Sequence, residues 1–289
     1  AKNNMFFYFL YRIGQFLALN LPLKFAYKMA VIVSDIRLLF NNQDKVETKG
    51  NLKAIFPGKS DKEINKITKA LFRNFAKYLV DFFRFSKIDK DYIEKNVEIK
   101  NAHYFDEALK AGQGVIALTA HIGNWELGGA VMGVMGYPLW AVALSHKHKA
   151  VDDFFISQRK IKGVNVIPLN RAGRQCFNCL KANKILALVG DRDFTQDGRI
   201  VDFFGKKSIF PEGPAVLSLK LGSPIVCGFM VRKPNDKFML VMEKPIKAAS
   251  DANNKEEAIK DLMKSYISIF EEYIRRYPDQ WYMFKIFWI

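Results

Sequence analysis

The sequence predicts an α/β protein with a largely parallel central sheet flanked by helices, preceded by a helical region. From about Val97 onward, near-continuous apolar runs of strand length alternate with helical segments. Such runs are typical of parallel strands that helices cover on both faces. Before that point the apolar residues recur at helical spacing instead. We therefore expect a helical region at residues 1–96 and an α/β domain at 97–289.

The first forty residues predict two amphipathic helices broken at Pro22. An aromatic-rich run extends from Met5 to Leu19, and a second apolar stretch extends from Phe25 to Phe40. Charged and polar residues interrupt both runs, whereas a membrane span needs about 20 apolar residues with few charges, and no signal-peptide cleavage site follows. We expect these helices to lie in a membrane interface with their basic residues at headgroup level. Packing on the protein's own core and a single tilted span are the alternatives.

The remaining elements follow from spacing and length. Apolar residues at three- and four-residue steps predict a helix from about Asp61 to Phe85, and a long helix is expected near 254–276. The expected strands are 115–119, 139–144, 164–167, 185–189 and 225–231. Ligand sites in such sheets lie beyond the carboxyl ends of the strands. Polar residues that follow these strands are therefore the candidates for chemistry.

The chain is strongly basic, with 45 Lys and Arg against 29 Asp and Glu and a formal net charge of +16. This excess favours an anionic partner, which could be a phospholipid surface, an acidic protein or nucleic acid. No nucleic-acid-binding module is recognisable, so we do not expect nucleic acid as the partner. Cys176-Phe-Asn-Cys179 has CxxC spacing, but no further ligands complete a zinc site. We expect two partly buried thiols on a helix.

A histidine and a glutamate follow the first expected strand of the central group, in His121-Ile-Gly-Asn-Trp-Glu126. Residues five apart on a regular helix point in different directions, so the pair can meet only through a sharp turn, which Gly123 allows. Glu126 would then accept a hydrogen bond from one ring nitrogen, and the other nitrogen would take a proton from an attacking hydroxyl. The alternative is a core histidine beside a surface glutamate.

A second polar group, Asp191-Arg192-Asp193, follows the strand at 185–189 and is expected to face the same crevice. Arg192 could bind an acceptor phosphate bidentately. By themselves the two acids also form the DxD pattern of metal-dependent glycosyltransferases, although the Arg between them and the absence of a nucleotide loop count against that function. Gly213-Pro214 predicts a helix start whose free N–H groups either bind phosphate or only cap the fold.

Several motifs also occur in the order of one family. Thr119-Ala-His-Ile-Gly-Asn-Trp-Glu-Leu-Gly128 resembles the HX4E signature of the bacterial late acyltransferases of lipid A biosynthesis, a branch of the lysophospholipid acyltransferase superfamily. The start, the end and three internal blocks look similar as well: Tyr11-Arg-Ile-Gly14, Val189-Gly-Asp-Arg-Asp-Phe194, Phe203-Phe-Gly-Lys206, Pro211-Glu-Gly-Pro-Ala-Val-Leu-Ser-Leu219 and Tyr277-Pro-Asp-Gln-Trp-Tyr282. The last internal block lacks the Arg of the superfamily's Phe-Pro-Glu-Gly-Thr-Arg, which puts its phosphate-binding role in doubt.

The resemblance implies a glycerolipid acyltransferase-like fold in which residues 97–289 form the catalytic domain. The enzyme would move a fatty acyl chain from acyl-acyl carrier protein, or acyl-CoA, to a hydroxyl of a lipid A precursor, with no metal or organic cofactor. His121 would be the general base and Glu126 its orienting carboxylate. Arg159 and Asp191 align roughly with residues that the family needs. They join Asn124, Arg192 and Gly213 as substrate-binding candidates.

The resemblance leaves the acceptor open, because similar sequences acylate other envelope glycolipids such as phosphatidylinositol mannosides. It implies a lipid acceptor, an anionic membrane surface and a location at the cytoplasmic face of the cell inner membrane. Acyl carrier proteins are acidic, so a basic face would speed their docking. Residues 146–149 with Arg159, Lys160 and Lys162 could form that face, or they could be ordinary exposed cations.

Overall fold

The computed structural model describes residues 2–40, 43–194, 198–247 and 254–289. The helices are α1 Lys2–Asn20, α2 Leu23–Leu39, α3 Gln43–Ile55, α4 Asp61–Phe83, α5 Lys90–Asn96, α6 His103–Lys110, α7 Trp125–Val134, α8 Lys149–Lys160, α9 Ala172–Lys181, α10 Gly213–Leu221 and α11 Lys255–Arg276. The strands are β1 Val97–Lys100, β2 Val115–Thr119, β3 Leu139–Ala143, β4 Asn165–Pro168, β5 Ile185–Val189, β6 Arg199–Phe203, β7 Lys206–Phe210, β8 Ile225–Arg232 and β9 Phe238–Met242. Short 3-10 turns lie at Phe85–Lys87, Leu169–Arg171 and Pro278–Gln280.

The strands confirm the predicted sheet. Among the described residues, seven strands form one sheet in the order β1-β9-β8-β2-β5-β3-β4, and all neighbouring pairs are parallel except β8 with β9. The five strands expected from apolar runs are β2, β3, β4, β5 and β8, within one or two residues at their ends. The first strand begins at Val97. The division into two domains at that point stays a prediction.

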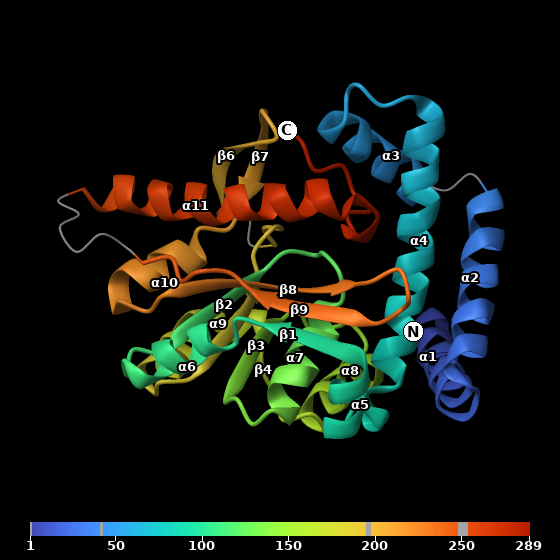
Figure 1. Ribbon diagram of the computed structural model, residues 1–289, viewed down its shortest axis with the longest axis horizontal. Helices are drawn as coiled ribbons and strands as arrows, with labels where there is room; N and C mark the ends of the chain where they lie inside the picture. The colour runs from blue at the N-terminus through green and yellow to red at the C-terminus, as the bar shows by residue number, and fades with distance from the viewer. Residues whose placement is uncertain (1, 41–42, 195–197, 248–253) are drawn as a thin grey trace.

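Alternate residues of the central strands build two cores, one on each face of the sheet. In β2, Ile116 and Leu118 belong to the core that contains the buried side of α11, whereas Val115 belongs to the core that contains Leu127 of α7. Figure 1 shows α11 running across one side of the sheet, with α6 and α7 on the other. Both faces are therefore covered, which explains the near-continuous apolar strands.

The expected helices at 61–85 and 254–276 are α4 and α11. Ser60 and Glu63 form a capping box at the start of α4, and Asn254 accepts hydrogen bonds from the first-turn amides of α11. Cys176 and Cys179 are buried on α9, as expected for structural thiols, and burial raises the pKa of Cys176 to about 11. These thiols are therefore not poised as nucleophiles.

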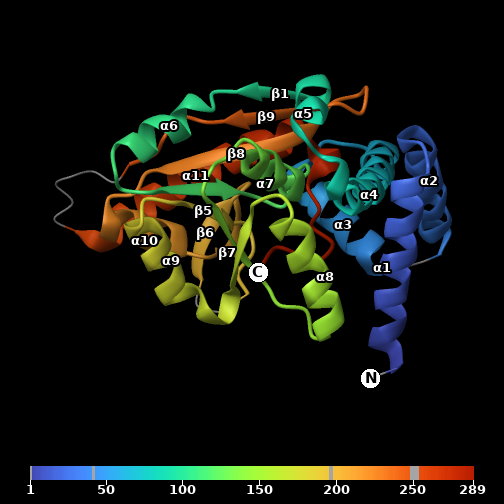
Figure 2. The same cartoon turned by 90° about the horizontal axis from the view of Figure 1, so that it is seen from below.

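The N-terminal helices form the expected pair broken at Pro22. Both views place α1, α2 and α4 together at one end of the sheet (Figure 1, Figure 2). One side of α2 packs on α4 through the buried Ala26 and Tyr27, whereas large apolar side chains elsewhere on α1 and α2 are exposed, among them Phe16, Val33 and Leu39. No helix in the described part of the chain is long and apolar enough to cross a membrane.

The β6–β7 hairpin was not among the expected elements. Its two-residue turn has positive φ at Phe204 and Gly205, the geometry that joins antiparallel strands tightly. Phe before Gly is a weak turn signal compared with Asn or Asp, so pattern alone did not indicate the hairpin.

Candidate active site

A cavity of about 610 Å³ opens at the carboxyl ends of the parallel strands, where the sequence predicted the site. It collects polar side chains from β2, β5, α7, α8 and the start of α10 that are far apart in the chain. Most of the remaining wall is apolar. The site candidates that line it are His121, Glu126, Arg159, Arg192 and Gly213.

His121 bonds to Asp191 at the base of this cavity. Ring atom Nδ1 lies 2.6 Å from Oδ1 of Asp191, and the backbone N–H of His121 donates to Oδ2 at 2.9 Å. The two residues are 70 positions apart. They meet because β2 and β5 are hydrogen-bonded neighbours with Thr119 opposite Val189, so the residues after both strand ends emerge together.

Asp191 is fully buried and held by three donors. The indole Nε1–H of Trp281 donates to Oδ2 at 3.1 Å, beside the two bonds from His121. Burial alone would raise the pKa of the Asp191 carboxyl, but the His121 imidazole and these hydrogen bonds outweigh burial and hold the pKa below its ordinary value. Asp191 is therefore an ionised acceptor, so Nδ1 of His121 carries a proton and Nε2 of the neutral ring is the acceptor atom.

The turn after β2 has the sharp geometry expected for Gly123, with φ of +65°. A Cβ at this position would lie 2.1 Å from the carbonyl oxygen of Met230, so no other residue fits without a backbone shift. The carbonyl oxygen of His121 also accepts a hydrogen bond of 2.8 Å from the backbone of Tyr282. The imidazole is thus fixed through backbone and ring together.

Glu126 does not hold the ring, which corrects the expected His121–Glu126 hydrogen bond. Its carboxylate instead accepts two bonds from Arg159 of α8, Nη2 to Oε1 at 2.5 Å and Nε to Oε2 at 2.9 Å. Trp125 lies next to the histidine in its place, with ring centroids 5.0 Å apart in an edge-on arrangement. Once Gly123 has turned the chain, the first turn of α7 directs Glu126 toward α8, and a planar guanidinium fits its two oxygens.

Arg159 is consequently a partner of Glu126 and not an exposed docking cation. Both side chains are mostly buried. Burial by itself lowers the Arg159 pKa, but the Glu126 carboxylate outweighs it and raises that pKa above its ordinary value. Lys162 donates to the carbonyl oxygen of Ile88 at 2.6 Å. Of the proposed basic face, Lys147, Lys149 and Lys160 are exposed, with Lys149 in an ion pair with Asp153.

Asn124 also differs from its expected role, because it is buried outside the cavity lining. Its side-chain oxygen accepts from the amide of Leu127 at 3.0 Å as the N-cap of α7, and its Nδ2 donates to Asp81 of α4 at 2.9 Å. Both ends of the amide are thereby used. Asn124 is therefore a buried helix cap next to the site, and its role in substrate binding stays a prediction.

Arg192 and Gly213 lie on the cavity wall as expected. The guanidinium of Arg192 lies 4.9 Å from the ring centroid of Phe194, which is itself part of the lining. Gly213 begins α10, and no atom lies within 4 Å of where its Cβ would be. The Arg192 guanidinium and the open space beside Gly213 would both accommodate an anionic group of a substrate.

The two acids of the DxD sequence are occupied within the protein. Asp191 bonds to His121 and Trp281, and Asp193 accepts from the amide of Gly198 at 2.9 Å. Across the described residues, no group of three or more His, Cys, Asp or Glu side chains is arranged to hold a metal ion. The geometry therefore gives no support to the glycosyltransferase alternative. Trp281 was missed as a site residue, since its role depends on where the C-terminal segment folds back.

A strand-end histidine bonded to a buried carboxylate, on the wall of a largely apolar cavity, is an arrangement typical of a class of enzymes that use histidine as a general base. The comparison with known families identifies the class as acyltransferases. The chain belongs to the bacterial lipid A biosynthesis acyltransferases, whose profile matches residues 2–288.

Curated relatives carry a narrower name. A phosphatidylinositol mannoside acyltransferase of Mycolicibacterium smegmatis is 28% identical over 231 residues, which cover 77% of this chain and 72% of the relative. The enzyme of the same name from Mycobacterium tuberculosis is 26% identical over 229 residues, covering 76% and 69%. The chain is thus similar to enzymes that differ in acceptor from those that give the family its name.

Proposed function

We propose that this protein transfers a fatty acyl chain from a thioester donor to a hydroxyl of an envelope glycolipid, with His121 as the general base. The observation that carries the proposal is the 2.6 Å contact between Nδ1 of His121 and the buried, ionised Asp191. It leaves Nε2 as the basic nitrogen on the wall of a cavity large enough for lipid groups.

In the proposed reaction, Nε2 removes the proton of the acceptor hydroxyl while its oxygen attacks the thioester carbonyl carbon. The C–O bond forms, the C–S bond breaks, and the imidazolium returns the proton to the leaving sulfur. Asp191 stays ionised throughout and stabilises the imidazolium. General base catalysis of this kind contributes about 10² to 10⁴ in rate.

The acyl chain has an apolar path beside the base. A cavity of about 80 Å³ shares Glu126, Arg159 and Leu188 with the large cavity. A second cavity of about 80 Å³ shares Thr119, Trp125 and Gly129 with the first. Together they extend between α7 and the sheet and are lined mainly by apolar side chains, with the Glu126–Arg159 pair where they meet the large cavity. A chain that enters beside His121 would lie along this path, because each buried methylene contributes about 0.8 kcal/mol.

The proposal includes acyl carrier protein as donor, with acyl-CoA as the alternative, and a location on the cytoplasmic face of the inner membrane. The net charge of +16 supports both an acidic carrier and an anionic membrane surface. The exposed apolar side chains of α1 and α2 support membrane contact. For the acceptor, the relatives favour a phosphatidylinositol mannoside and the family name favours a lipid A precursor; Arg192 fits a phosphate in either.

The test is mass spectrometry of lipids after incubation of the purified protein with each donor and both acceptor classes. We expect one acyl mass added to one acceptor class by wild type, and none by His121→Ala. His103→Ala is the matched control, since His103 is exposed at the start of α6. Equal products from wild type and His121→Ala would remove the proposed mechanism. No product with any acceptor would remove the proposed reaction.

A further inference from the structure

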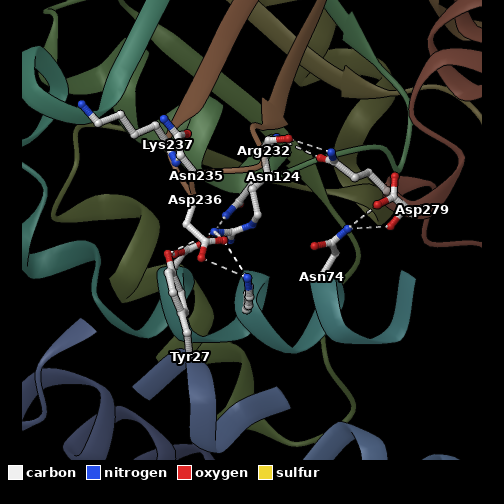
Figure 3. A network of polar contacts seen from close by, with 11 residues as sticks. Tyr27, Asn74, Asn124, Arg232, Asn235, Asp236, Lys237 and Asp279 are labelled. Atoms are coloured by element: carbon white, nitrogen blue, oxygen red, sulfur yellow. Dashed lines mark hydrogen bonds and ion pairs between the residues drawn. The ribbon is translucent and has the colours of Figure 1, made fainter. Parts of the chain in front are cut away.

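A buried polar network joins the N-terminal helices to the turn that carries His121 (Figure 3). At its centre is the carboxylate of Asp81, on α4 and 4% exposed. The Tyr27 hydroxyl of α2 donates to Oδ1, while Arg232 at the end of β8 and Nδ2 of Asn124 both donate to Oδ2. Arg232 also donates to the Tyr27 hydroxyl at 3.2 Å. Four elements therefore meet at one buried carboxyl group.

Forming this network costs more free energy than packing apolar side chains in the same space would, so its presence needs a physical reason. Burying an ion pair such as Asp81–Arg232 gives up hydration that the pair's attraction only partly restores. Its neighbours Tyr27, Asn124 and Arg232 are all less than one-tenth exposed. The network does fix the orientation of its side chains, because each donor group can bond to the two carboxylate oxygens in only one arrangement.

Asn124 connects this network to the active site. An amide whose Nδ2 is held by Asp81 must present its oxygen to the Leu127 amide, which is how it caps α7. Its backbone N–H also donates to the carbonyl oxygen of Met230 at 2.7 Å, next to the Gly123 turn. The residue after the cap is Trp125, whose ring lies against His121. A displaced Asn124 would therefore move the indole and the first turn of α7.

We infer that Tyr27, Asp81 and Asn124 form a positioning relay, by which a hydroxyl on α2 fixes the start of α7 and hence the geometry around His121. This inference rests on the proposed function and adds to it a link between the outermost helices and the reacting atoms. An apolar groove of about 330 Å³ lies between parts of α1, α2 and α4, so the packing of these three helices is incomplete there. The position of α2 on α4 would then affect catalysis through the Tyr27 hydroxyl.

The chain offers a matched control for this link. Asp35 on α2 also bonds to α4, through Arg73 Nε at 2.8 Å, and within the described parts of the chain neither residue forms a hydrogen bond or ion pair with α7. Tyr27→Phe removes the bond of the Tyr27 hydroxyl to Asp81, and Asp35→Asn removes the charge that pairs with Arg73 and Lys69, so both variants weaken polar contact between the same two helices. We expect Tyr27→Phe to lower kcat about tenfold with KM changed less than about twofold, because a small displacement of catalytic groups costs rate and not binding. Asp35→Asn should leave kcat within about twofold.

Two further variants separate the relay from helix capping. Asn124→Ser keeps an N-cap oxygen but removes the Nδ2 donor, and its hydroxyl lies one bond short of the position from which Nδ2 bonds to Asp81. The kcat should therefore fall about as far as in Tyr27→Phe. Adding Tyr27→Phe to Asn124→Ser should cause no further loss, whereas Asp35→Asn should combine additively with it. Equal kcat losses in Tyr27→Phe and Asp35→Asn, or additive losses for Tyr27→Phe with Asn124→Ser, would overturn the inference.

A readout independent of turnover keeps this test separate from that of the proposed function. Hydrogen exchange of the Leu127 amide, measured on the full chain, should speed up in Tyr27→Phe but not in Asp35→Asn. If wild type transfers no acyl group, the proposed function fails while the exchange comparison still decides the relay. Unchanged Leu127 exchange in Tyr27→Phe, with thermal unfolding confirming an intact fold, would contradict it.

Discussion

At the scale of single residues, Asp191 and not Glu126 bonds to His121, so substitutions of these two acids should affect the reaction differently. Asp191→Asn keeps the shape of the side chain but removes the charge that stabilises the imidazolium and selects the Nδ1–H tautomer. We expect kcat to fall by about 10² to 10⁴. Rates of purified variants at saturating substrate would measure it. Activity within tenfold of wild type would show that Asp191 does not serve the base.

Substitution of Glu126 should have a different effect, because its carboxylate bonds to Arg159 and not to the His121 ring. Glu126→Gln leaves a buried guanidinium without its counter-charge, and breaking such a pair typically costs about 3 to 5 kcal/mol of stability. We expect a lower melting temperature and a reduced rate, with the acidic limb of the pH–rate profile unchanged. Asp191→Asn should shift that limb, since it alters the histidine directly. A similar shift in Glu126→Gln would restore the pairing expected from the sequence.

The ionisation of Asp191 also predicts a pH dependence of stability. Its pKa is lower in the folded protein than the ordinary value of 3.8. A depressed carboxyl pKa contributes stability that is fully present above the unfolded value and is lost as pH falls through the folded one. The stability difference between wild type and Asp191→Asn, measured by urea unfolding, should therefore shrink as the pH falls below about 4. A difference that grew in acid would contradict the lowered pKa.

At the scale of elements, the sequence predicted where the strands lie in the chain but not which strands are adjacent in the sheet. Apolar runs give the position of β2 and β5, but strand order depends on which helices cover which face, and no local pattern carries it. The carboxylate five residues away therefore looked like the partner of His121, while the actual partner lies 70 positions away on an adjacent strand. The hydrogen bond of Asn124 could not be predicted for the same reason, because its partner Asp81 is on α4.

The path between α7 and the sheet predicts how chain length is selected. Ala187 of β5 lines both of its smaller cavities. Ala187→Leu would fill space there, so long acyl chains should lose more rate than short ones. Competition between donors of different chain length, with products separated by mass, would measure the change. The control is Ala172→Leu, which lies on the wall of the large cavity only. The same shift in both variants would argue against the path.

At the scale of the whole molecule, the N-terminal helices carry exposed apolar residues beside an element of the site. Tyr11 of α1 packs on Phe154 and Phe155 of α8, the helix whose Arg159 lies on the cavity wall. Phe16, Val33 and Leu39 are 65%, 65% and 82% exposed. This arrangement would let a lipid acceptor reach His121 while its chains stay in the bilayer. Contact of the helices with lipid is thus a condition of the proposed function and can be tested without turnover.

Replacing these three residues with serine should weaken partition onto vesicles of anionic phospholipid by at least about 100-fold, since that factor requires only about 110 Å² of apolar surface withdrawn from water at about 25 cal/mol for each Å². Ile161→Ser with Ile200→Ser is the control, because both residues are exposed but lie on α8's end and β6. Raising the salt concentration should weaken binding of all forms, since the basic surface attracts the headgroups. Sedimentation with vesicles measures each case. Undiminished binding of the triple variant, or an equal loss in the control, would mean that another face of the protein meets the membrane.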